Sequence, residues 1–323
     1  MREMARDGIS RRGLLFIMLL AIQFGMQPLF TKTYVSRDAD KVMLVLMCEV
    51  LKCVIAITLT FASKKGRESV GSFTLSDSLR SAAILAGLYA FQNILIQIGY
   101  QNVSGLLFNL LNQTKIVFTA IMVYLFTGKT QSRAQMFALL MVLIVGIVLT
   151  QPKEGLSEEG KQNAVWSGVF PTLGAALLSG LGAGWSQRVT RQKNKSAYLF
   201  SAEISFYSSA HLVASILFTS GFETLYPRAI NLFHENPHSW IPLCTNAVGG
   251  IFVGQVIKYA GGVSKSFSVI IGIILTGIAE YFLYEQAEVT LELACCIPVV
   301  GIAMYIYATN PVMDVQDDDK KQK

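Results

Sequence analysis

Three lysines, Lys52, Lys115 and Lys258, lie inside long apolar runs of the sequence. An ionised side chain in the middle of a membrane costs at least about 2.5–3.5 kcal/mol, so each lysine needs an anionic partner or a water-filled cavity. Lys52 follows Glu49 by three residues, which places both side chains on one face of a helix. We predict a structural ion pair, which can line a cavity but has no net charge to offer a ligand.

Lys115 lies near the middle of its apolar run, and that run contains no acidic residue. A lysine without a carboxylate nearby indicates that its counter-charge arrives with a ligand. The alternative is that the side chain extends to the lipid headgroups, which suits a lysine at the end of a span better than one in its middle. We therefore predict that Lys115 binds an anion.

Lys258 and Lys265 stand on either side of Gly261-Gly262, where one apolar run ends and the next begins. Both side chains can bind the same anion or reach the headgroups, and the sequence leaves these alternatives open. The helix that begins at Lys265 also offers free backbone N–H groups and the positive end of its dipole, which favour a phosphate group.

Other polar side chains could complete such a site. Tyr89, Gln92 and Asn93 cluster in one apolar run, and Asn109 and Gln113 lie four residues apart in the run that carries Lys115. Hydrogen bonds between helices would explain these amides equally well. The histidines, cysteines and acids show no spacing typical of a metal or catalytic site, so we predict no metal, no cofactor and no catalytic residue.

Ten apolar runs must position these residues, and each is long enough for the roughly 20-residue helix that crosses a bilayer. They cover 13–34, 42–62, 80–101, 103–127, 134–151, 164–186, 197–220, 240–260, 266–284 and 290–308. The residues 101–104 must form a very tight turn, and loops of at most about 20 residues join the other runs. The predicted fold class is an all-α membrane protein with ten transmembrane helices.

The charge pattern agrees with a membrane protein. Only 15% of the residues are charged, against about 25% in soluble domains. Of the 27 lysines and arginines, 18 fall in alternate segments that include both termini, six on the other side and three within spans. This bias places both termini in the cytosol. It also accounts for the net charge of +6, so we exclude a nucleic acid as partner.

The ten spans divide into two sets of five. We predict a first five-helix repeat over 1–151, a polar loop over 152–163, a second repeat over 164–308 and a cytosolic tail over 309–323. Because five is odd, the two repeats must insert with opposite orientations. Inverted repeats of this kind place a substrate site near the middle of the membrane, between the halves.

Several segments resemble those of the nucleotide-sugar transporters, in the CMP-sialic acid and UDP-sugar branch of the drug/metabolite transporter superfamily. They are Glu49-Val50-Leu51-Lys52, Tyr89-Ala90-Phe91-Gln92-Asn93, Gln113-Thr114-Lys115-Ile116, Ser179-Gly180, Gly249-Gly250 and KYAGGVSKSFS from Lys258 to Ser268. The segments follow one another over spans two to nine, so the resemblance covers most of the chain.

The resemblance implies two inverted five-helix halves and antiport of a nucleotide sugar against its nucleoside monophosphate. It also implies that Lys115 and Lys265 meet phosphate and that Asn93 and Ser179 line the cavity. The chain departs from these relatives at Ser201-Ala202-Glu203, where they carry Asn-x-Gln, and at Gly261-Gly262, where they carry Asp-Asn. The predicted substrate-binding residues are Lys115, Lys265, Asn93, Gln92, Tyr89, Ser179, Asn109, Gln113, Glu203 and Lys258.

Within the family, the chain most resembles plant-type carriers of UDP-N-acetylglucosamine and UDP-N-acetylgalactosamine in the endoplasmic reticulum. UMP is then the expected exchange partner. UDP-galactose, CMP-sialic acid or another organic phosphate are alternative cargoes. An integral-membrane enzyme of glycan or lipid synthesis is the alternative outside transport, but it would need a larger loop or a cluster of acids and histidines at one interface.

The C-terminus predicts a location. Lys320 and Lys321 stand at the fourth and third positions from the end, which resembles the cytosolic dilysine signal that coat machinery reads to return proteins to the endoplasmic reticulum. A solvated charged tail is the alternative. We predict a multi-pass protein among the lipids of the endoplasmic-reticulum membrane that can cycle with the Golgi; the sequence leaves its oligomeric state open.

Overall fold

The computed structural model describes residues 10–36, 39–89, 91–92, 95, 111, 114–149, 168–192, 194–235, 237–283, 291–310 and 313–314. Its longer helices are α1 (Arg11–Tyr34), α2 (Lys41–Ala62), α7 (Lys115–Thr127), α8 (Arg133–Leu149), α10 (Phe170–Gln187), α11 (Ala197–Ser220), α13 (Trp240–Tyr259), α14 (Lys265–Leu283) and α15 (Leu291–Thr309). The predicted turn at 101–104 and the polar loop at 152–163 lie outside the described residues.

Three of these helices are long and apolar enough to cross a membrane, over Arg11–Thr31, Val42–Ala62 and Trp240–Tyr259. Shorter apolar helices cover Lys115–Thr127, Arg133–Val145, Lys265–Thr276 and Ala294–Thr309. The described chain is helical apart from one antiparallel pairing of two-residue strands, β1 (Lys129–Thr130) with β2 (Met313–Asp314). The predicted all-helical membrane class is thus confirmed.

Short helices occupy two segments where the sequence predicted loops. On one side of the molecule, α3 (Lys64–Gly71), α4 (Leu75–Ser78) and a π-helical turn (Leu79–Ala83) follow α2. On the other, α12 (Leu225–Glu235) follows α11 and a 3-10 turn (Phe222–Thr224). Leu225, Ala229 and Leu232 pack from α12 against apolar residues of α2 and α11, because their helical spacing puts them on one face.

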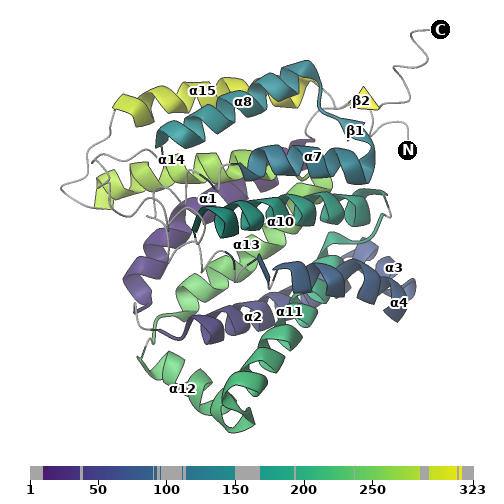
Figure 1. Ribbon diagram of the computed structural model, residues 1–323, viewed down its shortest axis with the longest axis vertical. Helices are drawn as coiled ribbons and strands as arrows, with labels where there is room; N and C mark the ends of the chain where they lie inside the picture. The colour runs from purple at the N-terminus through teal and green to yellow at the C-terminus, as the bar shows by residue number, and fades with distance from the viewer. Residues whose placement is uncertain are drawn as a thin grey trace.

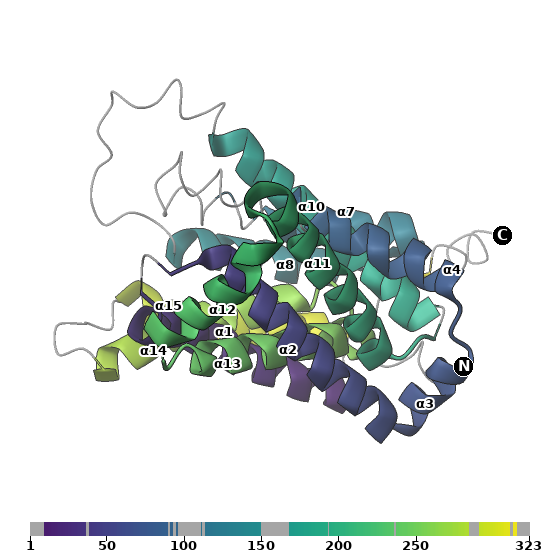
Figure 2. The same ribbon diagram turned by 90° about the horizontal axis from the view of Figure 1, so that it is seen from below.

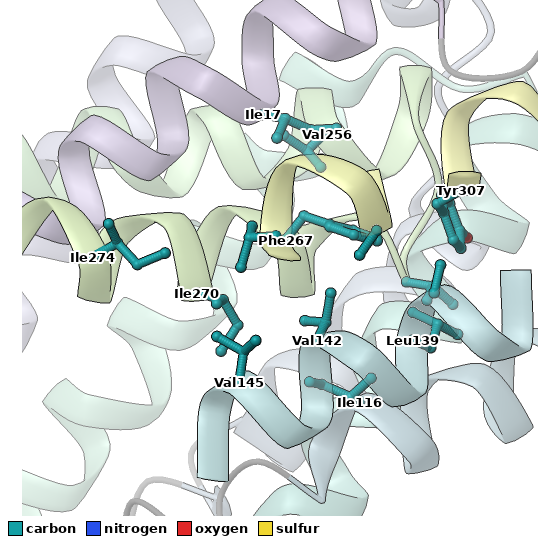
Figure 3. Packing of buried hydrophobic residues seen from close by; sticks show 14 of the residues in the cluster. Ile17, Ile116, Leu139, Val142, Val145, Val256, Phe267, Ile270, Ile274 and Tyr307 are labelled. Atoms are coloured by element: carbon teal, nitrogen blue, oxygen red, sulfur yellow. The ribbon is translucent and has the colours of Figure 1, made fainter. Parts of the chain in front are cut away.

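The long helices lie side by side in one bundle (Figures 1 and 2). Helix α1 packs on α14 and α13, α2 on α11 and α13, α10 on α7, and α8 on α15. The largest core cluster joins α1, α7, α8, α13, α14 and α15 around Phe267, as Figure 3 shows for Ile17, Val142 and Ile270.

Glycines allow two of these helix pairs to approach closely. A Cβ on Gly25 of α1 would lie 2.9 Å from the carbonyl oxygen of Gly272 in α14. In the other pair, a Cβ on Gly180 of α10 would lie 2.7 Å from the backbone of Phe118, and one on Gly184 would lie 2.9 Å from that of Met122, both in α7. Small residues four apart are a common means of close helix packing in membranes.

Candidate substrate cavity

A cavity of about 250 Å³ lies between helices that come from both predicted halves. Its charged lining residues are Glu49, Lys52 and Lys265. Its polar lining residues are Tyr89, Gln92, Ser179, Ser186, Thr190, Ser201 and Ser208. A polar and partly charged hollow inside an apolar bundle is suited to a hydrophilic ligand, because its charged and polar side chains can bind and orient such a ligand.

The ion pair lies in the wall of this cavity. Lys52 Nζ is 2.5 Å from Glu49 Oε1, the pairing that their spacing predicts, and each side chain is 17% exposed. Gly250 of α13 makes room for the lysine, because a Cβ there would lie 2.5 Å from Lys52 Cδ. The second carboxylate oxygen, Glu49 Oε2, is buried and has no hydrogen-bond partner within the described part of the chain.

Tyr89 and Gln92 line the cavity from the third predicted span. The phenol ring of Tyr89 lies against Gly182 of α10, where a Cβ would stand 2.6 Å from the tyrosine hydroxyl. Gln92 Oε1 is buried and has no hydrogen-bond partner among the described residues. Among the described helices, this oxygen of Gln92 therefore joins no pair, which leaves it as an acceptor at the cavity wall.

A glycine turn holds Lys265 at the cavity. Gly261 has φ +99°, a conformation that favours glycine, and the N–H of Gly262 donates to Gln187 Oε1 at 2.6 Å. Through this hydrogen bond, Gly261-Gly262 connects the start of α14 to the end of α10. Lys265, the first residue of α14, lines the cavity from this position.

Lys115 and Lys265 lie close enough for their positive charges to repel each other. Lys115 is the first residue of α7 and is partly buried, although it is not among the residues that line the cavity. Across the described residues, no carboxylate forms an ion pair with either lysine. Two neighbouring cations that no described acid pairs with have the charge to suit an anion with more than one negative charge.

Glu203 and Lys258 stand beside the cavity rather than in its lining. Glu203 is buried and pairs with Lys195, whose Nζ lies 2.7 Å from Glu203 Oε2. Lys258 Nζ lies 5.6 Å from the centroid of the Tyr259 ring and interacts with Lys65 of α3. The group that Lys258 and Lys65 form therefore lies outside the lining of the cavity.

Several lining hydroxyls were not predicted from the sequence. Ser186 and Thr190 come from the end of α10 and the π-helical turn after it (Arg188–Gln192), and Ser201 and Ser208 come from α11. Residues 201, 204, 208 and 212 follow one helical face, and this periodicity was a signal that could have identified that wall. Asn93, Asn109, Gln113, Lys320 and Lys321 lie outside the described residues, and their predicted roles stay predictions.

The apolar helices and the charged cavity between them define the class of protein, a helical membrane protein built to handle an anionic solute. A nucleotide-sugar transporter family model matches residues 13–308. The chain belongs to this family, which confirms the resemblance seen in its sequence segments.

Named relatives agree with this membership. A UDP-N-acetylglucosamine transporter of Arabidopsis thaliana, ROCK1, is 31% identical over 93% of both chains. A human UDP-N-acetylglucosamine transporter is 23% identical over 83% of this chain and 84% of its own. A UDP-galactose translocator of Canis lupus familiaris is 24% identical over 74% of this chain and 62% of its own.

A solved crystal structure has the same fold. It superposes with a TM-score of 0.66 over 93% of this chain and 98% of its own, at 11% sequence identity. The likeness at this identity concerns the arrangement of helices alone.

Proposed function

We propose that the protein exchanges UDP-N-acetylglucosamine and UDP-N-acetylgalactosamine for UMP, and that it moves the sugar nucleotide from the cytosol into the lumen of the endoplasmic reticulum or Golgi. One observation carries the proposal: Lys115 and Lys265 approach each other with no carboxylate partner among the described residues. A diphosphate supplies the missing charge. The names of the Arabidopsis and human relatives support N-acetylglucosamine as the sugar.

Exchange, rather than one-way transport, follows from the same two lysines. In the protein without ligand, the like charges of Lys115 and Lys265 lie near each other in a poorly solvated region, and movement of that region across the membrane is unfavourable. A bound phosphate group offsets the charge and lowers this barrier. UMP retains a phosphate after the sugar has been transferred, so it can return the carrier to the cytosolic side.

The helix pairing supports ten spans in two inverted repeats. A twofold relation between the halves exchanges spans one and six, and spans four and nine. The packing of α1 on α14 then corresponds to the packing of α10 on α7, and both pairs use close glycine contacts. The pairs α2 with α11 and α8 with α15 join equivalent spans of the two halves.

This architecture sets the proposed topology. The two termini lie in the cytosol, where the dilysine Lys320-Lys321 can meet coat machinery. The endoplasmic-reticulum membrane, with cycling through the Golgi, is the proposed location. Fluorescence protection of a tag at each terminus tests the orientation. The location of a protein tagged only at its N-terminus, with and without substitution of both lysines by serine, tests the retrieval signal.

UDP-galactose is a second candidate cargo, because two relatives carry it in their names: the canine UDP-galactose translocator and a Caenorhabditis elegans UDP-galactose/UDP-N-acetylglucosamine transporter that is 24% identical over 88% of this chain. A counterflow panel of nucleotide sugars separates these cargoes.

The test uses purified protein in liposomes preloaded with UMP. Labelled UDP-N-acetylglucosamine should enter these liposomes and should not enter liposomes preloaded with buffer. Free UMP outside should compete, whereas CMP should compete weakly. Uptake that ignores internal UMP would contradict exchange, and uptake of a different nucleotide sugar in the panel would correct the cargo.

A further inference from the structure

Lys195 lies at the centre of a buried ionic cluster beside the cavity. Its side chain is 11% exposed, and its Nζ lies 2.7 Å from Glu203 Oε2 and 3.2 Å from Asp77 Oδ2. Glu203 is 6% exposed and belongs to α11, whereas Asp77 is 39% exposed and belongs to α4. The cluster therefore joins the start of the third predicted span to the start of the seventh.

The cluster lies next to residues that line the cavity. Phe200, Ser201 and Ile204 line the cavity from the first turns of α11, and Glu203 projects from the same turns outside that lining. Lys195 Nζ stands 6.0 Å from the centroid of the Phe200 ring. Phe200 thus lies beside the ionic cluster and also lines the space that the ligand would occupy.

An unpaired carboxylate at Glu203 would oppose the binding of an anion. At about 10 Å and an effective dielectric constant of about 20, one unit charge changes the affinity for another by roughly tenfold. The cavity has little net positive charge, because Glu49 neutralises Lys52. Among the described lining residues, Lys265 is then the cation without a carboxylate partner.

We propose that Lys195 is a positioning residue that cancels the charge of Glu203 and fixes the first turns of α11, so that the cavity favours ligands with phosphate groups. This rests on the proposed function of nucleotide-sugar exchange. It also gives a physical role to Glu203, one of the positions where the chain departs from its relatives: the acid is accompanied by its own cation.

The inference is tested by competition with two ligands that differ in charge. Inhibition of counterflow by UMP and by uridine is measured for wild type, Lys195→Met, Glu203→Gln and the double variant. Lys195→Met should weaken inhibition by UMP about tenfold and inhibition by uridine less than twofold, because uridine has no phosphate. The double variant, which has neither charge, should return to within about threefold of wild type.

A matched control removes a cation without a buried partner. Lys64 is exposed at the start of α3 on the same side of the molecule, and Lys64→Met should leave both inhibition constants unchanged. A purely structural role of Lys195 would weaken UMP and uridine equally, or would leave the double variant as poor as Lys195→Met, and either result would overturn the inference.

Glu203→Gln keeps the test decisive if Lys195→Met does not fold. This variant retains Lys195 beside Asp77 and should bind UMP at least as tightly as wild type; weaker binding of UMP alone would contradict the proposed role. A wild-type protein that ignores UMP altogether would instead overturn the proposed function. The two failures are therefore distinguishable.

Discussion

Two regions of the molecule treat buried lysines in opposite ways. Lys52 and Lys195 each lie against carboxylates, at 2.5 Å from Glu49 and at 2.7 Å from Glu203. Lys115 and Lys265 instead lie near each other, and no described carboxylate pairs with them. The first pair of lysines is neutralised by carboxylates of the protein, whereas the proposed function assigns the neutralisation of the second pair to a ligand.

This difference predicts opposite effects of the same substitution. Removal of a lysine from the paired region leaves a buried negative charge, which destabilises the protein and also repels an anionic cargo. Removal of a lysine from the unpaired region relieves repulsion in the empty protein but takes away ligand binding. Substitution of a paired lysine should therefore lower both stability and transport. Substitution of an unpaired lysine should lower transport but not stability.

The largest effect on stability is expected at Lys52. Lys52→Ala leaves Glu49 without its partner and should destabilise the protein by about 3 kcal/mol, the lower end for a broken buried pair because both side chains are 17% exposed. The double variant Glu49→Gln/Lys52→Met should recover most of this loss. Thermal unfolding in detergent measures both variants. If Lys52→Ala were as stable as wild type, the contrast between paired and unpaired lysines would be wrong.

The next effect is on transport. Lys115→Ala or Lys265→Ala should reduce counterflow about 30- to 100-fold, because a hydrogen bond to a charged group contributes about 2–3 kcal/mol. The ligand-free protein should unfold at the same or a higher temperature than wild type, since one of two repelling cations is gone. UMP should stabilise wild type against heat but not these variants.

If Lys115→Ala transported as fast as wild type, Lys115 would not belong to the binding site. A lower thermal stability without ligand would show instead that Lys115 has a structural partner, and the contrast with Lys52 would disappear. Lys64→Ala, on the exposed face of α3, is the matched control and should change neither measurement.

Local spacing predicted part of this site and missed the rest for a physical reason. Lys52 and Glu49 are three residues apart in one helix, so their pairing could be predicted from the sequence. The pairing of Lys195 with Asp77 joins residues 118 positions apart, and no helical periodicity indicates it. The direction of Glu203, away from the cavity lining, depends likewise on where α11 packs.

The same distinction holds for the fold. The apolar runs predicted where long helices lie, because the length and hydrophobicity of a span are local properties. They did not predict α12, since its three packing residues, Leu225, Ala229 and Leu232, become a core only against α2 and α11. The proposal of two inverted halves rests on helix pairs that only the structure brings together.

A smaller effect should follow from Gly250→Ala, which disturbs the paired region without removing a charge. The new methyl group would lie 2.5 Å from Lys52 Cδ, so the lysine must shift and its bond to Glu49 must weaken. We expect a loss of about 1 kcal/mol of stability and a modest fall in transport. Gly301→Ala in α15 meets no atom within 4 Å and should be neutral; equal losses in both variants would contradict the role of Gly250.

The smallest effect is expected from an ion pair outside the spans, where water screens the charges. Arg228 Nε of α12 lies 2.6 Å from Asp40 Oδ2, and both side chains are a little more than a quarter exposed. The hydrogen bond from Arg228 lowers the pKa of Asp40 below its usual value. A lowered pKa stabilises the folded state above the unfolded value of about 3.9, and this contribution is lost as the pH falls through the folded pKa.

Asp40→Asn should therefore lower stability by less than about 1 kcal/mol at pH 7, because asparagine can still cap α2 and exposed pairs contribute little. The difference from wild type should be constant between pH 5 and pH 7 and should shrink only below about pH 4. Thermal unfolding of both proteins across this range measures it. A difference as large as that of Lys52→Ala would show that α12 is held as tightly as the cavity wall, and the contrast between buried and exposed pairs would fail.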